Sequence, residues 1–394
     1  MGDAQVEPVH RKQSGKPLGL GVVGAGAFGE FCIQAYAGMK EIIVIAVADI
    51  DIQRASAIAP RGAHVYGDYR DLLQAPDVDI VAIITPPYLH GKMIQQAAEA
   101  KKHIFVEKPL ATSLEEAYKV AETVREAGIK LSIDYVLRYH PLHCLAAKVI
   151  FTQALGQFQH FSLENFATDE SLPHNHWFWK RSESGGIHVE HGVHFFDLCN
   201  HFAGRAPSKV SGYSQKREDG LLDRVGATVI YGDEIFANFY HSFNRIRSNE
   251  QTTIRLHFTR GGIIISGWIP TNLRLQGVVD EDGQDTLQGL FLNNLQIHKH
   301  FHGQPAAFQH NEVTEQIVAE VSAEIKAPDR QRDYQQAIQA GMENLVGAIR
   351  GEEPLKVDIN DGLLSLAMAL AASDDRTDYE FIPPQGKFNQ LADS

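Results

Sequence analysis

The sequence predicts two domains: an α/β domain with a parallel sheet, followed by an α+β domain with a large, mostly antiparallel sheet. Three observations lead to this prediction. The first third of the chain alternates short apolar runs with helical stretches, which is the pattern of βαβ units. Beyond about residue 140, apolar runs follow one another across short turns, as antiparallel strands do. The chain of 394 residues is also longer than one hydrophobic core usually supports.

The first domain is expected to cover residues 18–140 and to follow a disordered polar tail, residues 1–17. Its expected strands are Leu18–Val23, Ile42–Ala48, 63–66, 80–84, His103–Val106 and Leu131–Ile133. Its expected helices are 28–39, 69–74, 89–100 and Leu114–Ala127. Because such a sheet binds ligands beyond the carboxyl ends of its strands, functional residues are expected there.

The second domain is expected to cover residues 141–394 and to begin with a helix over residues 142–151. Its expected strands are 158–166, 210–214, 227–231, 235–243, 252–258 and 263–268. Residues 231–234 are expected to form a hairpin turn, and residues 334–349 and 361–371 two closing helices. The uneven pattern of residues 271–307 indicates no particular element.

A glycine-rich run, GAGAFG at residues 24–29, lies between the first two expected strands. Gly24 permits a tight turn, Gly26 lets the backbone approach a pyrophosphate, and Gly29 allows the following helix to pack closely on the strand. The N-terminus of that helix favours a phosphate, and Asp49 follows the second strand where a ribose is usually held. The run therefore predicts dinucleotide binding.

The tripeptide Glu107-Lys108-Pro109 follows another expected strand. A lysine at this edge points into the ligand cleft, where it can hold a reacting hydroxyl and stabilise alkoxide character. The alternative is a solvated lysine on a loop, with Pro109 fixing the turn.

The segment 184–197 carries two adjacent glycines followed by several polar side chains. Glu190, His194 and Asp197 are spaced by four and three residues, so on an α-helix they share one face. A histidine beside a carboxylate suits general-base chemistry near neutral pH. The histidines also raise a zinc site as an alternative. We expect no metal, because the HExxH order is absent and His191 lies on another face of the helix.

Together these motifs resemble the Gfo/Idh/MocA oxidoreductase family, named after glucose–fructose oxidoreductase, inositol dehydrogenase and a rhizopine-catabolism protein. The resemblance runs from about residue 18 to about residue 383. It rests on the glycine run, Asp49, Thr85-Pro86-Pro87-x-x-His90, Glu107-Lys108-Pro109, Arg138-Tyr139-His140-Pro141 and the block from Trp179 to Asp197.

The resemblance implies a Rossmann domain followed by an α+β domain with a large, mostly antiparallel open sheet. It makes Lys108 the lysine that holds the substrate hydroxyl, His194 the catalytic base, and Glu190 the replacement of an aspartate that acts with the histidine. The expected cofactor-binding residues are Gly24, Gly26, Ala27, Phe28, Gly29, Asp49, Thr85, Pro86, His90, Glu107 and Lys108. The expected substrate-binding residues are Lys108, Tyr135, Arg138, His176, Trp179, Lys180, His191, His194 and Asp197.

The segment departs from the family pattern at four positions. Ser184 replaces the first glycine of a triplet, and Glu190 is one methylene longer than the usual aspartate. His188 and His191 stand where apolar residues are more frequent, as pocket polar groups or as surface residues. Upstream, residues 174–180 mix aromatic rings, imidazoles and an amide, which suits stacking on a sugar ring or a loop with core tryptophans.

The composition limits the partners. A formal net charge of −13 disfavours nucleic acid and anionic membranes, and no apolar run has the length of a membrane span. The odd, widely spaced cysteines Cys32, Cys144 and Cys199 indicate buried thiols in a reducing cytoplasm.

The sequence thus predicts a cytoplasmic NAD(P)-dependent oxidoreductase that oxidises a secondary hydroxyl of a sugar, sugar derivative or cyclitol. NAD is favoured over NADP because the Asp49 carboxylate repels a 2′-phosphate. The resemblance implies a homodimer or homotetramer. Two alternatives stay open: an NAD-dependent glycoside hydrolase that uses transient oxidation, and a non-catalytic, dinucleotide-sensing regulator.

Overall fold

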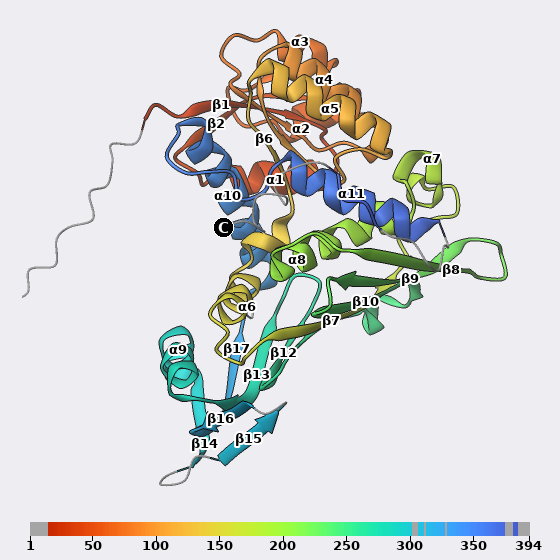
Figure 1. Cartoon of the computed structure of the whole chain (residues 1–394). Coiled ribbons are helices and arrows are strands. Elements are labelled where there is room, and N and C mark those ends of the chain that lie inside the picture. Colours follow the sequence, from red (N-terminus) through yellow and green to blue (C-terminus); the bar gives the residue numbers. More distant parts are fainter. Residues whose placement is uncertain (1–14, 302–305, 311–312, 328, 375–380, 385–394) are drawn as a thin grey trace, which may run out of the picture.

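The computed structural model describes residues 15–301, 306–310, 313–327, 329–374 and 381–384. The chain forms two large sheets, one near each end of an elongated molecule, with helices around and between them (Figure 1). Most of the expected tail, residues 1–14, lies outside the described residues.

The first sheet is parallel and has six strands in the order β3-β2-β1-β4-β5-β6. The strands are β1 (Leu18–Val23), β2 (Ile42–Ala48), β3 (His64–Tyr66), β4 (Ile80–Ile83), β5 (His103–Val106) and β6 (Leu131–Ile133). The order reverses between β1 and β4, so the carboxyl ends of these strands border the crevice in which a doubly wound sheet binds its ligand.

Helices cover both faces of this sheet (Figure 1). On one face lie α3 (Tyr69–Leu73), α4 (His90–Glu99) and α5 (Leu114–Ala127), and on the other lies α1 (Ala27–Tyr36) beside α10 (Arg330–Ile349). The short helix α2 (Ile52–Ile58) packs on β2 and β3. The sheet is therefore buried on both sides, which explains why its strands are continuously apolar.

The second sheet has nine strands in the order β14-β17-β13-β12-β11-β7-β10-β9-β8. Its pairs are antiparallel except for β7 with β10, which are parallel. The strands are β7 (Phe158–Thr168), β8 (Lys209–Lys216), β9 (Leu222–Tyr231), β10 (Ile235–Arg245), β11 (Gln251–Phe258), β12 (Gly261–Ser266), β13 (Asn272–Val279), β14 (Leu295–His300) and β17 (Ala319–Lys326). A small separate hairpin consists of β15 (Ala306–His310) and β16 (Val313–Ile317).

The remaining helices pack on one face of the second sheet or at its ends. They are α6 (Pro141–Phe151), α7 (Arg181–Ser184), α8 (Val193–Ala203), α9 (Glu281–Phe291) and α11 (Ile359–Ser373). Strand β10 alternates buried and exposed residues along its first half, because α8 and its neighbours cover one side only. Phe236 and Tyr240 consequently face outward from the uncovered side.

Two C-terminal helices link the sheets. Helix α10 packs against β5, β6 and α1 of the first sheet, and α11 lies against β6 and α5 as well as against α8 and β8 (Figure 1). The chain after residue 141 therefore contributes to the packing of both sheets. A single apolar core runs through the two layers, and Cys32 and Cys199 are buried within it as free thiols.

The predicted fold class is confirmed: a parallel α/β sheet is followed by a large, mostly antiparallel sheet with helices on one side. The unassigned stretch 271–307 contains β13, α9 and β14. The expected hairpin turn at residues 231–234 joins β9 to β10.

Candidate active site

The glycine turn after β1 has the geometry that the sequence predicts. Gly24 has a φ of +107°, and a Cβ atom there would lie 2.0 Å from the carbonyl oxygen of Ile84. A Cβ atom at Gly29 would lie 2.1 Å from the carbonyl oxygen of Gly24, so glycine is required at both positions. Gly26 faces open space and caps the N-terminus of α1. Its backbone is therefore free to approach a phosphate at the positive end of the helix dipole.

The carboxylate of Asp49 is held at the end of β2 by two backbone groups. Its Oδ2 accepts the N–H of Ala25 at 2.7 Å, and its Oδ1 accepts the N–H of Asp51 at 2.8 Å. Arg54 lies beside it but pairs with Asp51 at 3.7 Å. The negative charge at this end of the turn is thus fixed in place.

A cleft runs along the carboxyl edge of the first sheet in two connected parts. The first part, about 680 Å³, is lined by Asp49 and Gly24, and the second, about 560 Å³, by Lys108 and His194. Both parts share the residues Gly26, Ile84, Thr85, Pro86 and Trp177. The cleft is therefore continuous from Asp49 to Lys108 and His194, and an extended dinucleotide requires such continuity.

Lys108 and Glu190 join the two sheets at the second part of the cleft. The Lys108 ammonium donates at 2.7 Å to Glu190 Oε1 and also at 2.7 Å to the backbone carbonyl oxygen of Glu190. Both side chains are largely buried. Burial alone would raise the pKa of Glu190, but the charge and hydrogen bond of Lys108 outweigh it and lower that pKa. The Lys108–Pro109 peptide bond is cis.

Glu190 and His194 both line the second part of the cleft, although they lie in different elements. Residues His188–Gly192 form a π-helical turn that carries Glu190, and His194 follows at the start of α8. The sequence pairs the Glu190 carboxylate with His194, whereas in the structure it bonds to Lys108.

His194 lies at the start of α8 and is buried beside an aromatic wall. Its ring centroid is 4.7 Å from that of Trp268 and 6.3 Å from that of Tyr135. Burial lowers the pKa of His194 well below its ordinary value, and the charges of Lys108 and His191 lower it further. Within the described part of the chain, its Nδ1 atom has no hydrogen-bond partner. His194 is thus a neutral imidazole that can accept a proton.

His191 lies beside His194 and also lines the cleft. Burial lowers its pKa to about 4, although the Glu190 carboxylate opposes this. Its ring contacts those of His241 and Trp268. His188 is likewise buried, so the two unusual histidines of this segment are interior polar groups.

His90 acts behind the cleft. It is fully buried, and its two ring nitrogens lie 2.7 Å from the carbonyl oxygen of Pro109 and 2.8 Å from that of Thr85. Burial lowers its pKa, so the neutral ring donates to one of these oxygens at a time. His90 therefore positions the turns after β4 and β5, whereas Thr85 and Pro86 line the cleft themselves.

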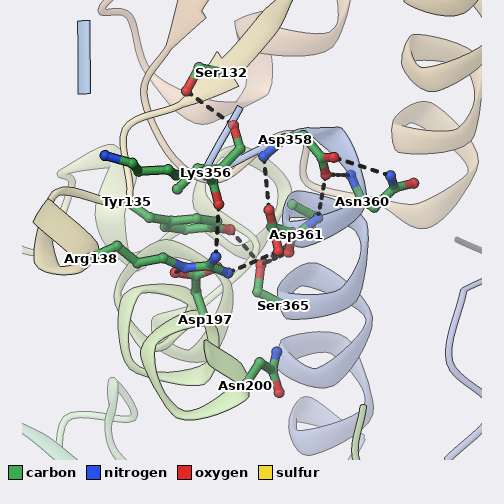
Figure 2. Close-up of polar contacts among 12 residues, drawn as sticks. Ser132, Tyr135, Arg138, Asp197, Asn200, Lys356, Asp358, Asn360, Asp361 and Ser365 are labelled. Carbon is green, nitrogen blue, oxygen red and sulfur yellow. Dashed lines mark hydrogen bonds and ion pairs between the residues drawn. The ribbon is translucent and has the colours of Figure 1, made fainter. Parts of the chain in front are cut away.

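Three expected substrate-binding residues belong to a different cluster (Figure 2). Arg138 donates to both carboxylate oxygens of Asp197, at 2.5 and 2.6 Å, and to Asp361 at 2.9 Å. The hydroxyl of Tyr135 lies 2.5 Å from that of Ser365. These side chains are buried where the chain after β6, α8 and α11 meet, and they do not line either part of the cleft. They link the segment after β6 to α8 and α11, and their contact with a substrate stays a prediction from the sequence.

The aromatic segment before α7 reaches the cleft with two of its residues. His176 lines the second part of the cleft, and Trp177 lines both parts. In contrast, the Trp179 indole donates to the carbonyl oxygen of Leu172, and the half-exposed Lys180 pairs with Glu183 at 3.0 Å. The structure thus places Trp179 and Lys180 outside the cleft.

The second part of the cleft is also lined by residues that the sequence did not single out, among them Asp134, Trp268 and Tyr334. Asp134 directly follows β6, so its place at a strand end is a signal that could have identified it. Trp268 and Tyr334 come from remote elements, and no local pattern indicates that they approach the cleft.

Two properties of the described residues bear on ligands. Among these residues, no group of three or more histidine, cysteine, aspartate or glutamate side chains is arranged to hold a metal ion. In the same part of the chain, no helix is both long and apolar enough to cross a membrane.

Comparison with known proteins defines the class first. Residues 18–135 match the profile described as an oxidoreductase family with an NAD-binding Rossmann fold. Residues 144–264 match the profile of the GFO/IDH/MocA C-terminal domain. The protein therefore has the NAD-binding Rossmann fold of an oxidoreductase. The chain belongs to the Gfo/Idh/MocA family, as the resemblance in its sequence predicts.

Individual relatives are more distant. YrbE of Bacillus subtilis (strain 168), an uncharacterised oxidoreductase, is 32% identical over 197 residues, which cover 50% of this chain and 56% of the relative. The scyllo-inositol 2-dehydrogenase (NAD(+)) of the same organism is 31% identical over 159 residues, covering 40% and 45%. The chain thus spans about half the length of these curated relatives.

A solved structure extends the likeness to most of the chain. Levoglucosan dehydrogenase in complex with NADH superimposes with a TM-score of 0.72 at 19% identity. The match covers 91% of this chain and 96% of that one. At this identity the likeness establishes the fold.

Proposed function

We propose that this protein is an NAD-dependent dehydrogenase that oxidises a secondary hydroxyl of a sugar, sugar derivative or cyclitol. The observation that carries the proposal is the pairing of Lys108 with Glu190 beside the neutral, buried His194. This group lies in a cleft that is continuous with a dinucleotide-type glycine turn. Ammonium, carboxylate and imidazole thus meet where the reacting end of a bound dinucleotide is expected.

The residues present fit a dinucleotide cofactor. The backbone at Gly26 is open toward the cleft at the N-terminus of α1, which suits a pyrophosphate. Asp49 offers a fixed carboxylate to the ribose hydroxyls and repels a 2′-phosphate, so we favour NAD over NADP. When bound, the nicotinamide supplies the acceptor for the hydride.

The side chains of this chain would supply the acid–base chemistry. His194 is neutral and buried, so it can take the proton of the substrate hydroxyl as hydride leaves the carbinol carbon. The Lys108 ammonium can hold the same oxygen and stabilise its alkoxide character. Glu190 keeps that ammonium in place by accepting two hydrogen bonds from it, one at Oε1 and one at its backbone carbonyl oxygen.

The substrate class rests on the cleft wall and on the relatives. His176 and Trp177 present an imidazole and an indole to the cleft, a combination that suits a hydroxylated ring. Two similar proteins are named for a cyclitol and for a sugar derivative, a scyllo-inositol 2-dehydrogenase and a levoglucosan dehydrogenase. We therefore include cyclitols, sugars and their derivatives in the proposed class.

A screen of NAD reduction tests the proposal. The purified protein is incubated with NAD and with sugars, cyclitols and their glycosides, and reduced nicotinamide is followed by its absorbance. We expect net NADH from at least one free sugar or cyclitol. Cleavage of a glycoside without net NADH would instead support the hydrolase, and cofactor binding without turnover on any compound would support the regulator.

A further inference from the structure

Two carboxyl groups lie side by side at the carboxyl edge of the first sheet. Strands β5 and β6 end at Val106 and Ile133, which are paired in register, and the Asp134 N–H donates to the Val106 carbonyl oxygen at 2.8 Å. Glu107 and Asp134 are therefore the next residues on adjacent parallel strands, about 5 Å apart along the hydrogen-bonding direction. Both line the second part of the cleft together with Lys108.

Burial raises the pKa of both acids of this pair, and the positive charge of Lys108 opposes that rise. Asp134 is only 2% exposed, and its Oδ1 atom has no hydrogen-bond partner in the part of the chain that the structure describes. Burial raises the pKa of Asp134 to about 7. Burial and the neighbouring Asp134 raise the pKa of Glu107 well above its ordinary value. The pair consequently holds a proton near neutral pH, because two buried carboxylates in contact do not both ionise readily.

The other titratable groups around the pair come from five parts of the chain. They are Lys108 after β5, Glu190 in the π-helical turn, His194 on α8, Cys32 and Tyr36 on α1, and Tyr334 on α10. Burial raises the pKa of Cys32, Tyr36 and Tyr334, so these groups stay neutral, and His194 is neutral as well. Lys108 is positive, but Glu190 neutralises it through their ion pair.

We propose that Glu107 and Asp134 form a proton-exchanging counter-charge that distinguishes the oxidised from the reduced cofactor. The inference rests on the proposed function, which places the nicotinamide end of the cofactor in this part of the cleft. The oxidised ring carries a positive charge and favours the fully ionised pair. The reduced ring is uncharged and favours the pair that keeps its proton. Binding of NAD⁺ therefore releases a proton from the pair, and binding of NADH does not.

The sign of the pH dependence follows from this linkage. Because NAD⁺ binding releases a proton, its affinity increases as the pH rises through the range in which the pair titrates. The affinity for NADH stays nearly constant there. A coupling that shifts the pair by about one pKa unit corresponds to a tenfold change in affinity. We expect the ratio of the dissociation constants, NAD⁺ over NADH, to fall about tenfold between about pH 6 and pH 8.

Isothermal titration calorimetry on the full chain measures both quantities without requiring turnover. Dissociation constants for NAD⁺ and NADH are determined across this pH range, in buffers with different ionisation enthalpies so that released protons are counted. The test variant is Asp134→Asn, which keeps the side-chain shape but removes one carboxyl. Glu107→Gln removes the other. Glu99→Gln at the C-terminus of α4 is the matched control, because it removes an exposed carboxylate that lines neither part of the cleft.

The proposal predicts proton release with NAD⁺ in the wild type and in the Glu99 variant, and its loss in either pair variant. Equal pH dependence for NAD⁺ and NADH in the wild type would overturn it. So would an unchanged proton release in both Asp134→Asn and Glu107→Gln. Failure of the wild type to bind either cofactor would instead refute the proposed function, and the inference with it.

Discussion

At the residue scale, the site depends on one ion pair and one neutral imidazole. Lys108 and Glu190 bond across the two sheets, and burial keeps His194 uncharged beside them. The ion pair fixes where the ammonium lies, and burial keeps His194 uncharged, with its Nδ1 atom unpaired among the described residues. Removing either the Lys108 or the His194 side chain is therefore expected to lower the turnover rate.

Lys108→Ala and His194→Ala should each lower kcat by about a hundredfold or more, the usual scale for an oxyanion stabiliser or a general base. His194→Ala should leave NAD affinity within a few-fold, because His194 lies on α8 in the second domain. The matched control is Lys180→Ala, a half-exposed lysine that pairs with Glu183 outside the cleft. Steady-state kinetics measures kcat for each variant, and titration with NAD measures its affinity. Near-normal kcat in either cleft variant would show that the active site is misplaced.

Asp49 should set the cofactor preference. Its carboxylate is fixed by two backbone N–H groups, so it repels a 2′-phosphate without moving away. We expect NAD to bind at least about tenfold more tightly than NADP, and Asp49→Ser to reduce that ratio by about tenfold, one charge interaction of about 1.4 kcal/mol. Asp71→Asn, an exposed carboxylate on α3, is the control. Equal affinity for NADP in the wild type would contradict the assignment.

Residue types and strand ends were enough to predict part of this site. Lys108 and Asp49 each follow an apolar strand, so the sequence alone predicts that both border the cleft. The partners of Asp197 and Glu190 were not predictable in the same way. Asp197 meets Arg138 only because α8 packs against the segment after β6. Glu190 meets Lys108 across 82 positions of sequence, a contact that residue spacing does not reveal.

At the element scale, the sequence predicts the strands of the first sheet and β7 to β12 of the second, but it misses β13, β14 and β17. Strands β1 and β4 are buried on both faces and read as continuous apolar runs. Strand β14 has no buried residue, and α9 buries only Gly283, Leu287 and Phe291. With so few buried positions, neither element has an apolar repeat from which a period can be read.

Helix α6 carries a histidine that makes folding sensitive to acid. His143 is 1% exposed and bonds to the Leu137 carbonyl oxygen through Nδ1 at 3.0 Å. Burial, the largest cause, lowers its pKa to about 3. In the unfolded chain this histidine has a pKa of about 6.5. Between that pH and about pH 3 the unfolded state binds more protons than the folded state, so the free energy of unfolding falls as the pH falls. His143 alone lowers it by about 1.4 kcal/mol per pH unit.

The variant His143→Leu should therefore lose stability less steeply between about pH 6 and pH 4 than the wild type. At neutral pH it should be less stable by about 1 kcal/mol, because the hydrogen bond to Leu137 is lost. Urea unfolding at several pH values measures both effects. The raised pKa values of Glu107 and Asp134 increase the free energy of unfolding as the pH falls. This effect is the same in the wild type and in the His143 variant, so it does not change their difference. An identical pH slope in the two proteins would refute the assignment.

At the scale of the whole molecule, the second sheet has one face covered by helices and one face uncovered. Phe236, Tyr240 and Ile264 are 43%, 37% and 41% exposed on the uncovered face. Neighbouring rings contact two of them: His160 stacks on Phe236, and Phe166 packs at a tilt against Tyr240. An aromatic patch on an open sheet favours association between copies of the chain.

We expect a dimer or tetramer that Phe236→Glu weakens. The charge would be buried in the contact, which costs several kcal/mol when it has no partner. Phe151→Glu on α6 is the matched control, because Phe151 is at least as exposed as Phe236 but lies on a helix, not on the sheet. Size-exclusion chromatography with light scattering gives the mass of each. A monomeric wild type, or loss of association in the Phe151 variant alone, would contradict this use of the sheet.

The central claim is hydride transfer from a carbinol carbon to the nicotinamide within the cleft. The most direct measurement uses a sugar or cyclitol found active in the screen and labelled with deuterium at the carbinol carbon that is oxidised. Mass spectrometry of the cofactor after turnover then shows where the label goes. Our account predicts deuterium in the reduced nicotinamide and none in the solvent. Oxidised product with an unlabelled cofactor, or label returned to the sugar with cleavage of a glycoside, would contradict it.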